Sequence, residues 1–103
     1  MAYYECAKLH ELVDGFRRVV RLPTMPVLVL HDCGQTYIIE NRCPHMDAPL
    51  HTGEFDGEVL RCRAHGIAFS LVTGRAEGPL KDALPCLKSF SIVYQGNGLG
   101  IDL

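Results

Sequence analysis

Short apolar runs separated by turns rich in glycine, asparagine and aspartate recur along the whole 103-residue chain. The runs contain many valine, isoleucine, tyrosine and phenylalanine residues, which is typical of β-strands. No segment keeps helical periodicity for the roughly 11 residues of an average helix. We therefore expect an all-β domain, with strands at residues 3–7, 16–22, 27–31, 36–40, 58–62, 67–71, 89–95 and 99–103.

Turn residues stand between several of these runs, which predicts that hairpins are the main connections. The turns are Asp32-Cys33-Gly34, Asp56-Gly57, Thr73-Gly74 and Gln95-Gly96-Asn97-Gly98. Residues 41–54 hold two prolines and show no alternation, so we expect an ordered loop there. A single helical turn is expected at residues 9–13, since Gly15 follows at once.

Composition narrows the class of protein. The chain is 48% hydrophobic and 21% charged, with a formal net charge of -2, which is too apolar for a disordered chain and too acidic for a typical nucleic-acid binder. No apolar run approaches the roughly 20 residues that span a bilayer, and the first residues do not form a secretory leader. The expected location is therefore the cytoplasm, where five cysteines favour metal ligation over disulfides.

Two mixed pairs of metal-binding residues carry the candidate chemistry. Cys43-Pro44-His45 and Cys62-Arg63-Ala64-His65 are separated by sixteen residues, and each offers one thiolate and one imidazole. Common zinc fingers pair cysteine with cysteine and histidine with histidine, which differs from the mixed pairs of this chain. A structural zinc site is nevertheless the alternative interpretation. The mixed pairs suit a binuclear centre in which two cysteines hold one iron and two histidines hold the other.

The four ligands, followed by Gly66, Phe69 and Thr73-Gly74, resemble the Rieske iron-sulfur family and its ferredoxin branch. The resemblance extends over nearly the whole chain and implies one domain at residues 1–103. It implies a Rieske fold of antiparallel sheets in a sandwich, with a small cluster-binding subdomain of two loops at about residues 41–80. It also implies one [2Fe-2S] cluster, with Cys43 and Cys62 on the inner iron and His45 and His65 on the outer iron.

The same resemblance implies an electron carrier with no catalytic residue of its own. Its transient partners would be a flavoprotein reductase and a terminal aromatic-ring-hydroxylating oxygenase. We expect no further catalytic domain in 103 residues. The alternatives are the small subunit of an assimilatory nitrite reductase, which shares the fold but often lacks the ligands, and a zinc-stabilised structural module.

Several positions depart from the family pattern. Arg63 stands where relatives often have proline, and it places a positive charge close to the cluster. The respiratory members' disulfide cysteines are replaced by Ala48 and Ala64, and their hydroxyl residues by Ile67 and Phe69. Because the cluster sulfurs then lose hydrogen-bond donors, we expect a low potential for a Rieske centre, roughly -150 mV or a little above.

The remaining candidate residues have plainer interpretations. No metal role is expected for Cys6, Cys33 and Cys86, and a surface or turn role is expected for His10, His31 and His51, with His51 near the cluster loop. The acidic run of Asp47, Glu54, Asp56 and Glu58 is either a docking patch or a solvated face. Met46, Leu50, Pro79 and Leu80 form either an apolar rim or ordinary loop packing.

Overall fold

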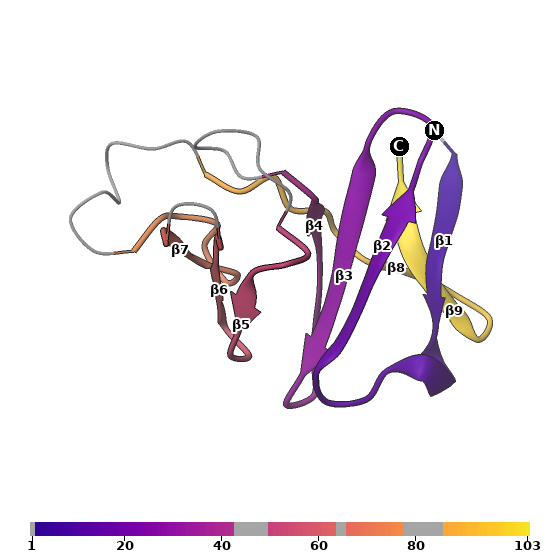
Figure 1. Ribbon diagram of the computed structural model, residues 1–103. Coiled ribbons are helices and arrows are strands. Elements are labelled where there is room, and N and C mark those ends of the chain that lie inside the picture. Colours follow the sequence, from indigo (N-terminus) through magenta and orange to yellow (C-terminus); the bar gives the residue numbers. More distant parts are fainter. Residues whose placement is uncertain (1, 43–49, 64–65, 78–85) are drawn as a thin grey trace.

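A computed structural model describes residues 2–42, 50–63, 66–77 and 86–103, and these form nine short strands in three antiparallel sheets (Figure 1). The first sheet has the order β1 (Tyr3–Lys8), β9 (Gly98–Asp102) and β8 (Val93–Gln95). The central sheet contains β2 (Phe16–Arg21), β3 (Pro26–Asp32) and β4 (Gln35–Glu40). The third contains β5 (Glu54–Phe55), β6 (Val59–Arg61) and β7 (Ala68–Ser70). The expected all-β class is confirmed, with the antiparallel sheets that the Rieske resemblance implied.

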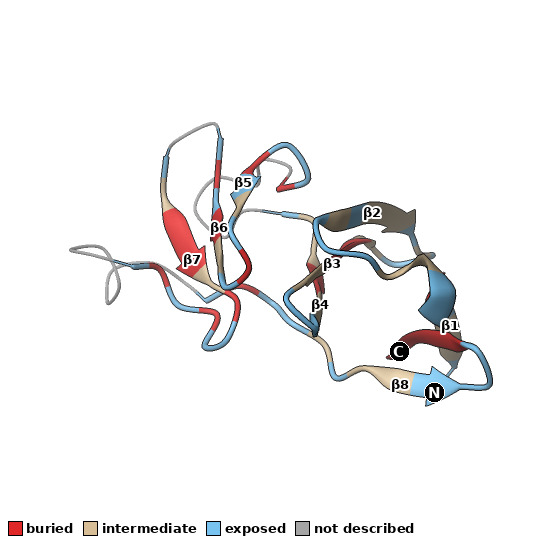
Figure 2. Ribbon diagram, turned by 90° about the horizontal axis from the view of Figure 1, so that it is seen from below, coloured by how far each residue is buried: buried red, intermediate tan, exposed pale blue. Residues whose placement is uncertain are grey.

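The central sheet lies between the other two sheets and separates two hydrophobic cores (Figure 2). Successive side chains of a strand point to opposite faces, and the four fully buried residues 27–30 of β3 therefore divide between the two cores. The first core, toward the third sheet, contains Leu28, Leu30, Ile39, Leu50, Leu60, Cys62, Phe69, Leu71, Ala76 and Leu87. The second core, toward the first sheet, contains Cys6, Ala7, Val27, Val29, Ile38, Leu99 and Ile101.

A tight hairpin joins β3 and β4 of the central sheet, as the turn residues Asp32-Cys33-Gly34 predict. The β3–β4 turn has two consecutive residues in the left-handed region, Cys33 at φ 51° and Gly34 at φ 78°. This is the geometry that lets a two-residue turn follow the twist of its strands. Gly57, Gly74 and Gly96 also have positive φ values, and Gly96 lies in the β8–β9 turn. The turn signals are therefore confirmed at the positions expected.

The structure differs from the expected elements in three places. Residues 54 and 55 form strand β5 instead of ending a loop, because they pair with β6 at Arg61 and Leu60. The strand expected at residues 89–95 is limited to β8, since Ser89 and Phe90 bond first to the edge of β4 and the chain then crosses to the first sheet. The helical turn is a 3-10 helix, η1, at Leu9–Glu11. Among the described residues, no helix is long and apolar enough to cross a membrane.

Glu11 links η1 to the central sheet through its carboxylate. Its Oε1 accepts hydrogen bonds from the Lys8 backbone N–H at 2.8 Å and from Arg18 Nη1 at 3.0 Å, and its Oε2 lies 2.6 Å from Arg18 Nη2. These interactions, the Arg18 hydrogen bond above all, lower the pKa of Glu11 to about 2. A carboxyl whose folded pKa is depressed adds stability that is present above its unfolded pKa and lost as pH falls through its folded pKa.

We therefore expect E11Q to be less stable than the parent at neutral pH, and the difference to shrink between about pH 4.5 and pH 2. Chemical denaturation of both proteins at several pH values measures this difference. The same change at exposed Glu77 is the control and should leave the pH dependence close to that of the parent. A stability difference between E11Q and the parent that is constant from pH 7 to pH 2 contradicts the assigned role of the Glu11–Arg18 pair.

Candidate metal centre

Cys62 is the predicted ligand that the structure places, directly after β6. Its side chain is fully buried and belongs to the first core, beside Leu60 and Phe69. The other three predicted ligands, Cys43, His45 and His65, lie outside the described residues. In the sequence, Cys43 and His45 follow the end of β4, and His65 is three residues after Cys62.

The backbone reverses tightly after Cys62. The Gly66 N–H donates to the Cys62 carbonyl at 2.7 Å, and the Cys62 N–H donates to the Ile67 carbonyl at 2.8 Å. Gly66 has a φ of 70°, which an L side chain rarely adopts, so this position favours glycine. Arg61 Nη1 also donates to the Gly66 carbonyl, at 2.5 Å. Gly66 therefore allows the close approach of the backbone to the Cys62 carbonyl.

A cavity of about 280 Å³ lies next to Cys62. It is lined by Thr52, Glu54, Arg61, Cys62, Arg63 and Gly66. Arg61 and Arg63 are exposed, so positive side chains border the hollow on the side of the second loop. A buried cysteine beside such a hollow is a ligand that an iron-sulfur group uses. The described part of the site therefore fits a metal-sulfur group.

Two of the other described cysteines, Cys6 and Cys33, have surroundings that disfavour metal binding. Burial raises the pKa of the Cys6 thiol. The adjacent Asp32 carboxylate raises the pKa of exposed Cys33, with its hydrogen bond to Asp32 acting in the same direction. Both residues therefore remain neutral thiols, whereas metal ligands are thiolates. Cys86 is exposed, and Cys6, Cys33, Cys62 and Cys86 are all unpaired.

The three histidines that were not expected to bind metal lie apart. His10 is exposed on η1, and His31 Nδ1 lies 2.7 Å from Thr36 Oγ1 across the β3–β4 pair. His51 is exposed, with its Nδ1 3.1 Å from Asn41 Nδ2. Within residues 2–42, 50–63, 66–77 and 86–103, no group of three or more histidine, cysteine or acidic side chains could hold a metal ion. The positions of His10 and His51 agree with the expected surface role, whereas His31 is half-buried within β3.

The acidic and apolar candidates are placed in part. Glu54, Asp56 and Glu58 are all exposed on the third sheet and its turn, while Asp47 lies outside the described residues. Leu50 is fully buried in the first core, so ordinary packing is confirmed for it and an apolar rim is not. Met46, Pro79 and Leu80 lie outside the described residues.

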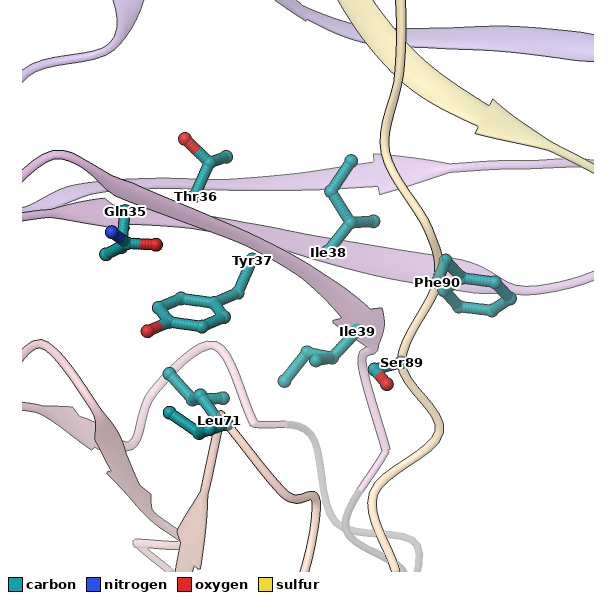
Figure 3. Close-up of a pocket in the computed structure, with 9 residues that line it drawn as sticks. Gln35, Thr36, Tyr37, Ile38, Ile39, Leu71, Ser89 and Phe90 are labelled. Atoms are coloured by element: carbon teal, nitrogen blue, oxygen red, sulfur yellow. The ribbon is translucent and has the colours of Figure 1, made fainter.

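A second hollow, of about 320 Å³, lies along the outer edge of β4 (Figure 3). Tyr37 and Leu71 face each other across it, and Ile39 lies beside them. Burial raises the pKa of Tyr37, and the nearby Glu58 carboxylate raises it further, so the phenol stays neutral. Among the residues that the structure describes, no cysteine or histidine lines this hollow, so they form a gap between the central and third sheets and not a metal site.

Two residues that hold the first loop in place were missed by the sequence reasoning. Arg17 donates from β2 to the carbonyls of His51 and Gly53, and Asn41 accepts from the N–H groups of Leu50 and His51. Arg17 gave no signal, because an arginine on a strand is usually solvated. Asn41 gave a weak one, since asparagine beside a loop commonly bonds to nearby backbone.

Comparisons with known proteins agree on one family. The family profile of the Rieske [2Fe-2S] domain matches residues 2–91. Ferredoxin CarAc of Metapseudomonas resinovorans is 41% identical over 69 residues, which cover 67% of this chain and 64% of the relative. The toluene-4-sulfonate monooxygenase system iron-sulfur subunit TsaM1 of Comamonas testosteroni is 39% identical over 72 residues, which cover 66% of this chain and 21% of the relative. The chain therefore spans less than two thirds of the length of either relative.

Solved structures give the same fold. The ferredoxin of Sphingomonas yanoikuyae B1 superposes with a TM-score of 0.85 at 23% identity, covering 99% of both chains. A chain from the complex of reduced oxygenase and oxidised ferredoxin in carbazole 1,9a-dioxygenase superposes with a TM-score of 0.82 at 26% identity, covering 96% of this chain and 91% of the other. The predicted fold is confirmed by these superpositions.

Proposed function

The chain belongs to the Rieske [2Fe-2S] family, and on that basis we propose that it carries single electrons from a flavoprotein reductase to a terminal aromatic-ring-hydroxylating oxygenase. One [2Fe-2S] cluster, the group that defines the family, supplies the one-electron redox centre when bound. The observation that carries the proposal is the profile match over residues 2–91 together with the likeness to ferredoxins of oxygenase systems. In each cycle the chain accepts one electron and passes one on, and it transforms no substrate.

In this proposal Cys43, His45, Cys62 and His65 hold the cluster. The mixed Cys/His spacing supports all four, and the position of buried Cys62 beside a hollow supports the second pair. Residues 1–103 act as one domain with a cluster-binding subdomain at about residues 41–80. The third sheet supports this division, because it is separate from the other two sheets and packs through the first core against one face of the central sheet.

The chain's own residues would shield and orient the redox centre. Leu50, Leu60 and Phe69 are fully buried in the core that contains Cys62, so they exclude water from the protein side of the site. Exposed Arg63, directly after Cys62, places a positive charge at the surface that a partner would approach. Electron-transfer complexes bury small interface areas, so a small charged surface is enough to bind a transient partner.

The proposal includes a cytoplasmic location. Cys6, Cys33 and Cys86 are unpaired, and two of them are exposed. Exposed free thiols persist in reducing compartments and are oxidised or paired in oxidising ones. This supports a place in the cytoplasm, where flavoprotein reductases have access to reduced nicotinamide cofactors.

Spectroscopy and reconstitution test the proposal. The purified protein should be red-brown and contain about two irons and two sulfides per chain, with a reduced-state average g value below that of all-cysteine clusters. Added to a flavoprotein reductase and a ring-hydroxylating oxygenase, it should restore reductant-dependent hydroxylation. A colourless protein with one zinc per chain makes it a structural module instead. A red-brown protein that no such oxygenase can oxidise contradicts the carrier role.

A second candidate is the cluster domain of a longer oxygenase subunit. The match to TsaM1 favours it, because that relative is about five times longer than the matched part. In that case the electron would pass within one polypeptide to a catalytic iron. The two candidates differ in the reconstitution: a free carrier supports turnover by a separate oxygenase at substoichiometric concentration, whereas an excised oxygenase domain does not.

Replacing His65 by cysteine should lower the reduction potential, by on the order of 100 mV, because a neutral imidazole is exchanged for a charged thiolate. Added negative charge at the cluster opposes the incoming electron. Redox titration followed by EPR measures the shift. H10C is the matched control, since exposed His10 lies on η1, outside the ligand motif, and its potential should equal that of the parent. An H65C protein that keeps its cluster at an unchanged or higher potential contradicts ligation by His65.

A further inference from the structure

The turn at residues 50–53 connects the end of the first loop to β5. The Gly53 N–H donates to the Leu50 carbonyl at 2.9 Å, which closes the turn. The Leu50 side chain is fully buried in the first core, so one side of the turn is anchored by packing. The turn follows the segment that contains Cys43 and His45 and precedes the strand that pairs with β6.

Asn41 ties the two ends of the first loop together. Its Oδ1 accepts hydrogen bonds from the backbone N–H groups of Leu50 at 2.9 Å and His51 at 3.0 Å. Because Oδ1 is the acceptor, the Nδ2 group donates to His51 Nδ1 at 3.1 Å. The Asn41 backbone N–H in turn donates to the Pro26 carbonyl at 3.0 Å, which fixes Asn41 to the start of β3.

Arg17 ties the same turn to β2. Its Nη1 donates to the carbonyl of His51 at 2.6 Å and to the carbonyl of Gly53 at 2.7 Å. Hydrogen bonds from a charged donor are shorter and about twice as strong as neutral ones. Arg17 pairs with Leu30 in the register of β2 and β3, so its backbone is held by a strand that contains four fully buried residues. One guanidinium nitrogen therefore connects the central sheet to two points of the turn.

The turn also touches the segment that leads to Cys62. A Cβ atom on Gly53 would clash with the Arg61 carbonyl oxygen, so the turn and β6 lie closer together than any residue with a side chain allows. Arg61 directly precedes Cys62. A shift of the turn would therefore move the backbone on both sides of the site: the segment that ends at Leu50 and the strand that ends at Arg61.

We propose that Arg17 and Asn41 are positioning residues that hold the two cluster-binding segments at a fixed separation, and thereby set how tightly the cluster is retained. This rests on the proposed function only in that the retained group is the [2Fe-2S] cluster. Neither side chain is a ligand. Arg17 sets the position of the turn relative to the central sheet, and Asn41 sets the closure of the first loop.

Three variants separate positioning from charge. R17M removes the donors and keeps an unbranched side chain of similar length. R17K keeps the positive charge and a donor that reaches about one atom less far, so it should restore part of the effect. R21M removes the same charge from exposed Arg21, four residues further along the same face of β2, and leaves the hydrogen bonds of Arg17 intact.

Cluster release to an iron chelator is the first readout. We expect R17M to lose its cluster at least about tenfold faster than the parent. A tenfold change corresponds to about 1.4 kcal/mol, which is within the range for losing the hydrogen bonds that hold the loop. R17K should lie between R17M and the parent, and R21M should match the parent. Broader EPR lines in R17M than in R21M are also expected, because the ligand geometry becomes less uniform. Equal release rates in R17M and R21M overturn the proposal.

Amide hydrogen exchange is the second readout and does not depend on the identity of the metal. The amides of residues 50, 51 and 53 should exchange faster in R17M than in R21M, whether the protein holds a cluster or zinc. A parent protein without iron refutes the proposed function, while the exchange rates still decide the role of Arg17. If R17M does not fold, R17K decides, and release and exchange rates equal to the parent's then overturn the proposal.

Discussion

C62S should be purified without its [2Fe-2S] cluster, as a colourless protein with less than about a tenth of the parent's iron and sulfide. Cys62 is fully buried and lines the cavity of the candidate site. No other described cysteine lines this cavity, so none could replace Cys62 as a ligand. A serine hydroxyl is a poor substitute because soft thiolates, and not hydroxyls, hold iron-sulfur clusters in proteins. Iron and sulfide content and the visible spectrum measure the loss.

C86S is the matched control for this experiment. Cys86 is exposed and unpaired, so the same atom is exchanged outside the ligand set. Its iron content and spectrum should equal those of the parent, and the difference between the variants assigns the loss to ligation. A C62S protein that keeps two irons per chain with an unchanged spectrum contradicts the proposal that Cys62 is a ligand.

F69A should lower the free energy of unfolding by about 3–5 kcal/mol, the range for removing a buried phenylalanine from a core. Phe69 is the largest fully buried side chain described, and it pairs with Leu60 on β6 and bridges to Ala76. The cavity would open beside Cys62 in the first core, so we also expect faster cluster release. Guanidinium unfolding of the loaded protein measures the stability.

V72A provides the comparison for F69A. Val72 is three residues away and 68% exposed, so its truncation should change stability by less than about 0.5 kcal/mol. F69L, which keeps an apolar side chain of intermediate volume, should lie between F69A and the parent. A loss below about 1 kcal/mol in F69A would mean that the third sheet contributes little to the cooperative fold.

Local signals in the sequence predicted the hairpins but not how the sheets associate. Cys33 and Gly34 follow an aspartate at the end of an apolar run. The two-residue turn that they form requires only residues that accept positive φ, so the sequence alone predicts it. The pairing of β1 with β9 joins residues almost 100 positions apart, and no short-range pattern specifies such a contact. Strand β5 was missed because it has two residues, too few to show alternation.

The candidate site likewise contains both residues that the sequence predicts and residues that it does not. Cys62 was predicted as a ligand because its residue type and its spacing from the other cysteine and the histidines follow from metal chemistry. Arg17 was not, since it lies 34 residues from His51 in the chain and only the folded register brings them together. Ligands can be recognised in a sequence by their chemistry, whereas the residues that position them depend on tertiary contacts.

The two buried faces of strand β3 restrict how this chain can change in length. In β3, Leu28 and Leu30 face the first core while Val27 and Val29 face the second. Inserting one residue before this run would reverse the direction of every following side chain and exchange the contents of the two cores. Insertions and deletions should therefore be excluded from β3 and tolerated at its exposed hairpins. In an alignment of related chains, we expect β3 to be free of gaps even where its residues vary.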